Sequence, residues 1–93
     1  QSNGAHTTNA GDGNNTITTG SGNQNVTTGG GNDLISTGGG NDTISAGNGS
    51  NKVLTGGGND GITTGSGNDF IDVGPGVDSC SAGGGTNIVV NCP

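Results

Sequence analysis

Five aspartates recur at multiples of nine residues, each after a glycine-rich stretch. They are Asp33, Asp42, Asp60, Asp69 and Asp78. Calcium in proteins takes roughly six to eight oxygen ligands, drawn from carboxylates and backbone carbonyls. A glycine-rich turn leaves its carbonyl oxygens uncovered because glycine has no side chain. The aspartates and the turns before them therefore predict calcium sites.

The aspartates belong to a nine-residue repeat that runs without a gap over residues 11–91. Glycine occupies repeat positions 1 and 3 in all nine copies, Asn is the commonest residue at position 4, and the aspartates stand at position 5. Position 7 is Ile or Val except at Cys80. Such a regular pattern is the signature of a repeat architecture and argues against a disordered chain.

The composition excludes several functional classes. Only 23% of the 93 residues are hydrophobic, with one Phe and no Trp, Tyr or Met, too few for an ordinary globular core. The net charge is −6, and Lys52 is the one Lys or Arg, so nucleic acids and anionic membranes are poor partners. No apolar run approaches the ~20 residues of a membrane span.

Each repeat position has a structural role in the fold that the pattern predicts. Glycine at positions 1 and 3 is expected to supply backbone angles closed to other residues, which allows sharp turns. Positions 6 to 8 read polar, aliphatic, polar, which predicts a short strand with one inward side chain. Two turns and two strands close one coil, so the predicted fold is an all-β β-solenoid of about five 18-residue coils.

The predicted roll has a cap at each end of the repeats. Residues 1–10 fit the repeat weakly and are interpreted as a degenerate N-terminal cap. Residues 11–91 are the nine repeats, and residues 92–93 are a C-terminal cap. Cys80 and Cys92 are expected to form a disulfide across the open end, because end repeats need covering and paired cysteines favour an oxidising compartment.

The segments TGGGNDLIS, TGGGNDTIS and TGSGNDFID resemble the RTX, or haemolysin-type, repeat G-G-x-G-x-D-x-U-x, in which U is a large aliphatic residue. The resemblance covers about residues 11–91 and implies that the solenoid is a right-handed parallel β-roll of about five 18-residue coils, with calcium in its turns. The C-terminal GVDSCSAGGGTNIVVNCP resembles the terminal repeats of secreted actinobacterial members. The chain departs from the motif where Thr, Ala or Val replaces the first Gly and where Asn or Gln replaces the Asp.

Alternate repeats place their turns on the same edge of the roll, which separates the sites into two groups. One edge carries His6, Gln24, Asp42, Asp60 and Asp78. The other carries Asn15, Asp33, Asn51, Asp69 and Asn87. Neighbouring carboxylates on the first edge predict the tightest sites. Each pair on the second edge has one Asp and one amide, so calcium binding there is expected to be weaker. The alternative is that each Asp caps its own turn through a side-chain hydrogen bond.

Calcium is expected to drive folding. The predicted core is one aliphatic side chain per repeat. The free energy gained by burying so few side chains is small compared with the conformational entropy lost when a glycine-rich chain folds. Stacked aspartates would also repel one another without a cation. Because calcium is scarce in the cytosol and abundant outside, folding would follow secretion, and a bacterial protein of the cell exterior or surface is expected. No nucleophile and base are paired at a concave site, so an enzyme is not expected.

The two outer faces suggest different functions. The hydroxyl face, formed by the strands of the even-numbered repeats, carries Thr27, Thr43, Ser45 and Thr63. The apolar face, formed by the odd-numbered repeats, carries Leu34, Leu54, Phe70, Ile88 and Val90. The favoured interpretation is a structural or adhesive module that self-associates, as a homo-oligomer or fibril, through the apolar face or the roll's ends. One alternative is an ice-binding protein using the hydroxyl face, and another is the processed tail of a larger exported protein.

Overall fold

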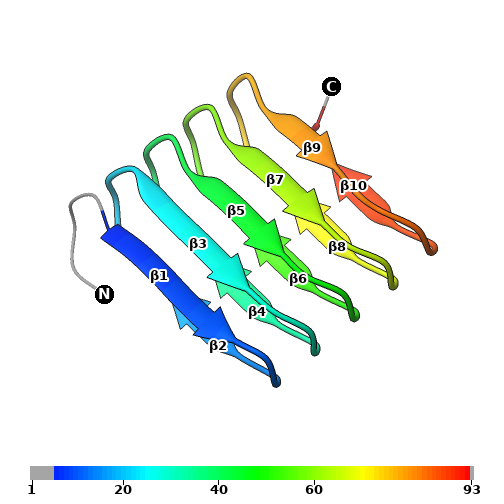
Figure 1. Ribbon diagram of the computed structural model, residues 1–93. Helices are drawn as coiled ribbons and strands as arrows, with labels where there is room; N and C mark the ends of the chain where they lie inside the picture. The colour runs from blue at the N-terminus through cyan, green and yellow to red at the C-terminus, as the bar shows by residue number, and fades with distance from the viewer. Residues whose placement is uncertain (1–5, 93) are drawn as a thin grey trace.

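The computed structural model describes residues 6–92, and their regular structure is entirely β-strand. The strands are β1 (His6–Gly11), β2 (Thr16–Thr18), β3 (Gln24–Thr28), β4 (Leu34–Ser36), β5 (Thr43–Ala46), β6 (Lys52–Leu54), β7 (Gly61–Thr64), β8 (Phe70–Asp72), β9 (Ser79–Ser81) and β10 (Ile88–Val90). Figure 1 shows them stacked as successive coils joined by narrow turns at both edges. The all-β prediction is confirmed. The described residues contain no helix long and apolar enough to cross a membrane.

The coils form two parallel sheets, each built from alternate strands. The first has the order β1-β3-β5-β7-β9 and the second the order β10-β8-β6-β4-β2. Strand neighbours are 18 residues apart, so that Ile17 pairs with Ile35 and Ile35 with Val53. The predicted β-solenoid of about five coils is therefore confirmed. The molecule is a thin slab with extents of 31 × 28 × 12 Å.

The core between the sheets is larger than the predicted single aliphatic side chain per repeat. Position 7 supplies seven buried residues, Ile17, Val26, Ile35, Ile44, Val53, Ile62 and Ile71. Position 9 also points inward, where Ala46 and Val73 are buried together with threonines. In β3 the burial alternates over Gln24, Val26 and Thr28, because successive side chains of a strand point to opposite faces. Positions 5, 7 and 9 therefore form the interior.

Repeat positions 1 and 3, which are glycine in every repeat, have different structural roles. This corrects the expectation that both positions supply unusual backbone angles. Every position 3 glycine has a positive φ, from 94° at Gly85 to 125° at Gly76. At position 1 only Gly11 and Gly74 do. Elsewhere position 1 needs glycine because the coils lie close together. A Cβ on Gly47 would lie 2.6 Å from the carbonyl oxygen of Gly29 in the preceding coil.

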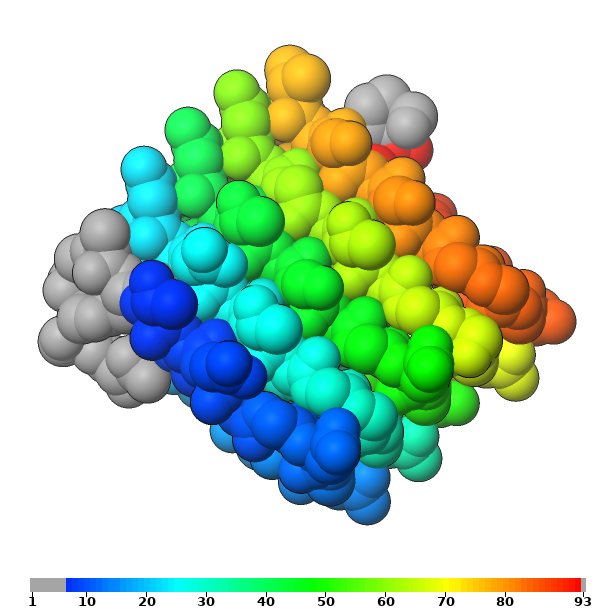
Figure 2. Space-filling model, viewed as in Figure 1, coloured from blue at the N-terminus to red at the C-terminus, as the bar shows by residue number. Residues whose placement is uncertain are grey.

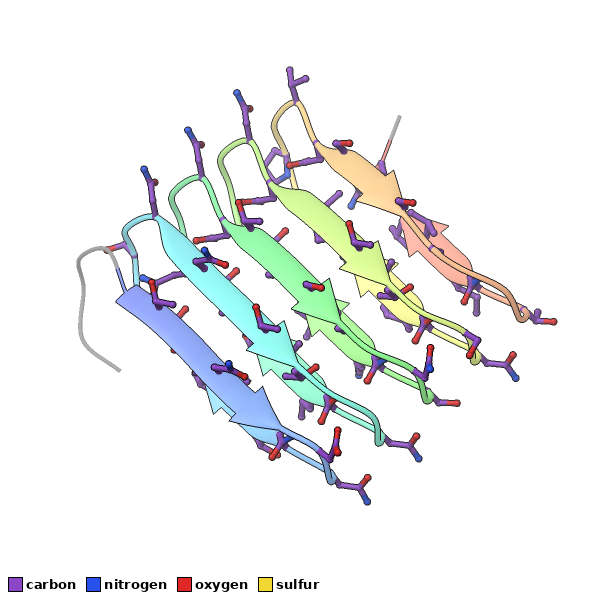
Figure 3. All side chains as sticks on the ribbon, viewed as in Figure 1. Atoms are coloured by element: carbon purple, nitrogen blue, oxygen red, sulfur yellow. A yellow bond between two sulfur atoms is a disulfide. The ribbon has the colours of Figure 1, made fainter. Side chains whose placement is uncertain are left out.

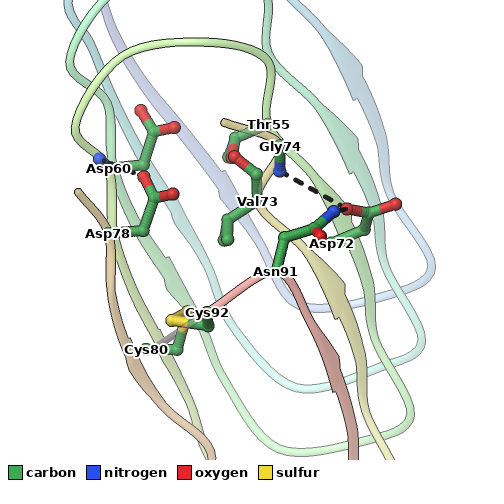
Figure 4. Close-up of a disulfide and its surroundings, with 9 residues drawn as sticks. All are labelled: Thr55, Asp60, Asp72, Val73, Gly74, Asp78, Cys80, Asn91 and Cys92. Carbon is green, nitrogen blue, oxygen red and sulfur yellow. Dashed lines mark hydrogen bonds between the residues drawn. A yellow bond between two sulfur atoms is a disulfide. The ribbon is translucent and has the colours of Figure 1, made fainter. Parts of the chain in front are cut away.

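The two ends of the roll are built differently. β1, from the weakly matching segment, pairs with β3 and extends the first sheet. At the other end Cys80 of β9 forms the expected disulfide with Cys92, with their Cα atoms 6.4 Å apart (Figure 4). Val89, at a core position of the last repeat, is 41% exposed because no further coil covers it. The disulfide thus ties the chain end across an otherwise open core.

Candidate metal sites in the turns

The five position 5 aspartates are buried at the two edges of the roll. Their side chains are 1% to 5% exposed, although each belongs to a turn. Figure 3 shows side chains at equivalent positions of successive coils lined up in rows. Carboxylates are seldom buried unless they are paired or bind a metal. The aspartates therefore need partners inside the protein.

One oxygen of each carboxylate has a backbone partner in the preceding coil. The Asp42 N–H donates to Oδ1 of Asp60, and the Asp60 N–H donates to Oδ1 of Asp78, both at 2.8 Å. On the opposite edge the Asn51 N–H donates to Oδ1 of Asp69 at 2.9 Å. These bonds join residues 18 apart. The position 5 carboxylates thus connect coils, in place of the alternative in which each caps its own turn.

The second oxygen of each carboxylate has no such partner. Oδ2 is buried without a hydrogen bond in Asp33, Asp42, Asp60, Asp69 and Asp78. A buried carboxylate oxygen without a donor or cation costs on the order of several kcal/mol. The described residues bring no three Asp, Glu, His or Cys side chains into one cluster. An ion at these oxygens would therefore take backbone carbonyls as its other protein ligands.

The asparagines at position 5 reveal which carbonyls those are. Oδ1 of Asn51 accepts the Asp33 N–H, as a carboxylate does at this position, and its Nδ2 donates to the carbonyls of Gly47 at 2.9 Å and Gly49 at 3.2 Å. Oδ1 of Asp60 is held in the same way by the Asp42 N–H, so the glycine carbonyls at the same repeat positions are the expected neighbours of its Oδ2. A carboxylate oxygen and two carbonyl oxygens are ligands that calcium prefers.

The environment of Asp60 raises the pKa of its carboxyl group. Burial, which removes water from the charged form, is the largest cause. The neighbouring charges of Asp42 and Asp78 also raise the pKa, whereas the hydrogen bond from the Asp42 N–H and the nearby Thr55 side chain lower it. Figure 4 shows the Asp60 and Asp78 carboxylates stacked on the same edge. Without a cation, this edge disfavours the ionised form of its central carboxylate.

The strand register groups the position 5 residues as predicted from the sequence. His6 pairs with Gln24 in the first sheet, and hydrogen bonds continue the series through Asp42, Asp60 and Asp78. The other edge alternates amides and carboxylates from Asn15 to Asn87. The side chain of His6 lies outside the described residues. The three adjacent aspartates are therefore on one edge, and Asp33 and Asp69 on the other.

The sequence interpretation missed the residues at position 9. Thr19, Thr28, Thr37 and Thr64 are buried there, and their hydroxyl oxygens have no hydrogen-bond partner. The position 9 residue lies five before the next position 5 residue. Thr55 lies close enough to Asp60 to lower the pKa of its carboxyl group, and its hydroxyl donates to the Val73 carbonyl at 3.1 Å. The signal was present in the sequence as a Thr five residues before most of the aspartates.

Position 4 makes a separate ladder on the outside of the turns. Its asparagines are exposed, and the N–H of Asn41 donates to Oδ1 of Asn23 at 2.8 Å. The same bond runs from Thr86 to Asn68. These bonds point in the opposite chain direction to those at position 5. Two neighbouring positions of one turn therefore differ completely: position 4 faces water and position 5 faces the interior.

The outer faces follow the strand register. Thr27, Thr43, Ser45 and Thr63 are all exposed on the first sheet, which Figure 2 shows as regular rows. On the second sheet Leu34 is 40% and Ile88 57% exposed, whereas Leu54, Phe70 and Val90 are partly buried. The Lys52 ammonium lies 5.8 Å from the centroid of the Phe70 ring. The apolar face is thus interrupted by one cation that rests against its aromatic residue.

Comparison with known families gives one result that bears on these turns. The model of the RTX calcium-binding nonapeptide repeat matches in four overlapping copies, over residues 9–35, 18–53, 27–62 and 54–89. No curated protein and no solved structure matches the chain. The matched region includes all five buried aspartates and the glycine turns before them. The chain therefore belongs to the RTX calcium-binding nonapeptide-repeat family.

Proposed function

We propose that this β-roll is a secreted structural or adhesive module that folds when calcium binds its turns outside the cell. One observation carries the proposal: five buried carboxylates each leave Oδ2 without a partner. In the Asn51 turn, glycine carbonyls lie within hydrogen-bond distance of the side-chain atom that corresponds to Oδ2, and we take the aspartate turns to offer the equivalent carbonyls. A doubly charged cation is the partner that suits this arrangement of oxygens.

The residues proposed to hold calcium are Asp33, Asp42, Asp60, Asp69 and Asp78. Bound calcium would supply the positive charge that the buried carboxylates lack. The protein's part is to fix the ligands: the glycine at position 3 turns the chain, and the N–H of the preceding coil holds Oδ1. Only Oδ2 and the carbonyl oxygens are then left to bind the ion. We assign the module no catalytic role, in keeping with a family that is typically structural.

Coupling of folding to calcium follows from the charges on the first edge. Asp42, Asp60 and Asp78 occupy adjacent coils and are at most 5% exposed, so their charges repel in a poorly hydrated interior. The burial of the hydrophobic core is what offsets this repulsion, and among the described residues that core has nine buried hydrophobic side chains, none larger than Ile. Metal binding that exists only in the folded state contributes its whole free energy to folding. Calcium-poor cytosol would keep the chain unfolded until export.

Circular dichroism during a calcium titration tests the proposal, with calorimetry to count the ions. We expect β-sheet signal to appear with calcium and to disappear on chelation, while magnesium at the same concentration has little effect because it demands a tighter octahedral site. A chain that is equally folded in chelator and takes up no calcium would contradict both calcium binding and its role in folding.

A second candidate function, ice binding, has one favourable observation. Thr27, Ser45, Thr63 and Ser81 form a continuous exposed column of hydroxyls, because each pairs with the next across the first sheet. A flat hydroxyl array at strand spacing suits ordered water. The neighbouring column is interrupted by Gly61. Thermal hysteresis of the calcium-loaded protein tests this candidate. Activity that is lost in Thr27→Tyr and Thr63→Tyr would support it, and no activity would exclude it.

A further inference from the structure

We infer that the chain contains two kinds of turn, and that the turns of Asn15, Asn51 and Asn87 are closed by their own side-chain amide in the place where the aspartate turns take calcium. The inference rests on the proposed function, because it presumes calcium in the aspartate turns. It goes further by assigning which turns bind no metal and why. In these turns the amide nitrogen acts as a built-in substitute for the cation.

The evidence is a set of repeated hydrogen bonds. Nδ2 of Asn15 donates to the carbonyls of Gly11 at 2.9 Å and Gly13 at 3.1 Å. Nδ2 of Asn51 donates to the glycine carbonyls at the same two repeat positions, at 2.9 and 3.2 Å. Nδ2 of Asn87 does so less tightly, at 3.0 to 3.4 Å. In all three turns the carbonyls that would bind an ion already have donors.

The amide also removes the electrostatic need for an ion. An asparagine side chain is neutral, with one acceptor and two donor hydrogens. In Asn51, which is 2% exposed, Oδ1 accepts from Asp33 while Nδ2 serves both carbonyls. Nothing polar is left unsatisfied at this side chain. In Asp69, one coil further along the same edge, Oδ2 has no partner. The two side chains hold the same repeat position and accept the same backbone bond at Oδ1, yet only the aspartate is left with an unpaired buried oxygen.

An independent observation separates the same turns. The residue five before each asparagine is alanine, at Ala10, Ala46 and Ala82. The residue five before an aspartate is threonine in four of five turns, at Thr28, Thr37, Thr55 and Thr64, and valine once, at Val73. Thr55 lies close enough to Asp60 to lower the pKa of its carboxyl group, so this position is near the carboxylate. A hydroxyl oxygen thus accompanies four of the five aspartates, and a methyl group accompanies all three asparagines.

Gln24 stands apart from both kinds of turn. Its Nε2 lies 3.4 Å from the carbonyl of Ser21 and 3.5 Å from that of Gly22, longer than the contacts of Asn51. The extra methylene of glutamine displaces the amide relative to asparagine. Its predecessor is Thr19, as in the aspartate turns. We therefore count only the turns of the three asparagines as turns closed by a side-chain amide.

The arrangement has a consequence for charge along each edge. Closed turns alternate with Asp33 and Asp69, so ions on that edge would be two coils apart. On the other edge Asp42, Asp60 and Asp78 are in consecutive coils. The alternating edge therefore needs fewer ions and carries less repulsion. It is the edge that can form its turns first, before calcium is bound.

Exchange of Asp and Asn at position 5 tests the inference in both directions. The double variant Asp33→Asn/Asp69→Asn gives every turn of the alternating edge an asparagine at position 5. We expect it to bind two fewer calcium ions by calorimetry and to show more β-sheet signal in chelator than the unmodified chain. Asn51→Asp should add one ion and raise the calcium concentration needed for half-folding. The control is Asn68→Asp, which adds the same charge at exposed position 4 of the same edge and should change neither quantity appreciably.

The outcomes separate this inference from the proposed function. If the unmodified chain takes up no calcium, the proposed function fails. If it binds calcium but Asn51→Asp behaves like Asn68→Asp, and the double Asn variant gains no metal-free structure, the amide does not replace the cation. A double variant that is less structured than the unmodified chain in chelator would also overturn the inference. Gain of an ion in one variant with loss of two in the other would support it.

Discussion

The backbone N–H of Asp42 donates to Oδ1 of Asp60 at 2.8 Å, and Oδ2 of the same carboxylate is buried without a hydrogen-bond partner. One side chain therefore links two coils with one oxygen and presents the other to the turn. This division explains how an aspartate can be structural before metal binds and a ligand afterwards. It also makes the central carboxylate of the first edge the most sensitive one.

Asp60→Ala is expected to weaken calcium-induced folding more than any other single Asp→Ala change. It removes the Oδ2 ligand, leaves the Asp42 N–H without its acceptor, and touches both neighbouring coils. A calcium midpoint raised by about tenfold corresponds to about 1.4 kcal/mol, a modest value for such a loss. Circular dichroism titrations measure the midpoint. Asp12→Asn, an exposed loss of charge that keeps the acceptor for Gly30, should leave it nearly unchanged.

Two adjacent glycines of one turn, Gly57 and Gly58, should respond differently to substitution by alanine. Gly58 has a φ of 107°, so Gly58→Ala forces a side chain into a backbone region that costs about 1–3 kcal/mol. A Cβ on Gly57 would meet nothing within 4 Å, and no positive φ is required there. Gly57→Ala should therefore be neutral or slightly stabilising. Denaturant unfolding at saturating calcium measures both, and equal effects would contradict the assigned roles.

Much of this fold could be predicted from the sequence because each repeat obeys the same rule. The nine-residue period predicted the length of each coil and which turns share an edge of the roll. Ile or Val at position 7 identified the hydrophobic core. The burial of position 9 was missed because threonines such as Thr28 and Thr64 are polar residues. Their burial follows from the alternation of side chains along the strand. Asn51 was interpreted as a weakened ligand. The hydrogen bonds from its side-chain amide to two backbone carbonyls depend on the backbone geometry of the turn, which the sequence pattern does not specify.

Loss of the disulfide should loosen the C-terminal coil before the rest. Cys80 and Cys92 close a 12-residue segment, and a loop of that length stabilises by about 3 kcal/mol in the chain-entropy model. Without this link no covalent bond ties the segment after the already exposed Val89 to β9. In Cys80→Ser/Cys92→Ser, hydrogen exchange should accelerate in β9 and β10 first. Uniform acceleration from β1 to β10 would show that the bond stabilises the whole roll instead.

Self-association through the apolar face predicts an effect of its most exposed large side chain. Ile88 is 57% exposed and lies beside Phe70 in the adjoining strand. Ile88→Ser should shift sedimentation toward the monomer at saturating calcium. Val77 is 76% exposed but belongs to a turn, which makes Val77→Ser the matched control. If both variants sediment like the unmodified chain, association does not use this face.

The folded chain should respond to pH with opposite sign before and after calcium binds. Burial raises the pKa of Asp60 above its ordinary value, so the metal-free folded state binds the proton more tightly than the unfolded state does. Its stability is then greatest at low pH and falls as pH rises through the raised pKa. Calcium requires the ionised carboxylate, so its affinity should rise over the same range. In metal-depleted buffer, β signal should decrease as pH rises above the ordinary pKa of an aspartate, about 4, while the calcium midpoint falls. Asp60→Asn should flatten the metal-free profile, and a profile that rises with pH without calcium would contradict this account of the edge.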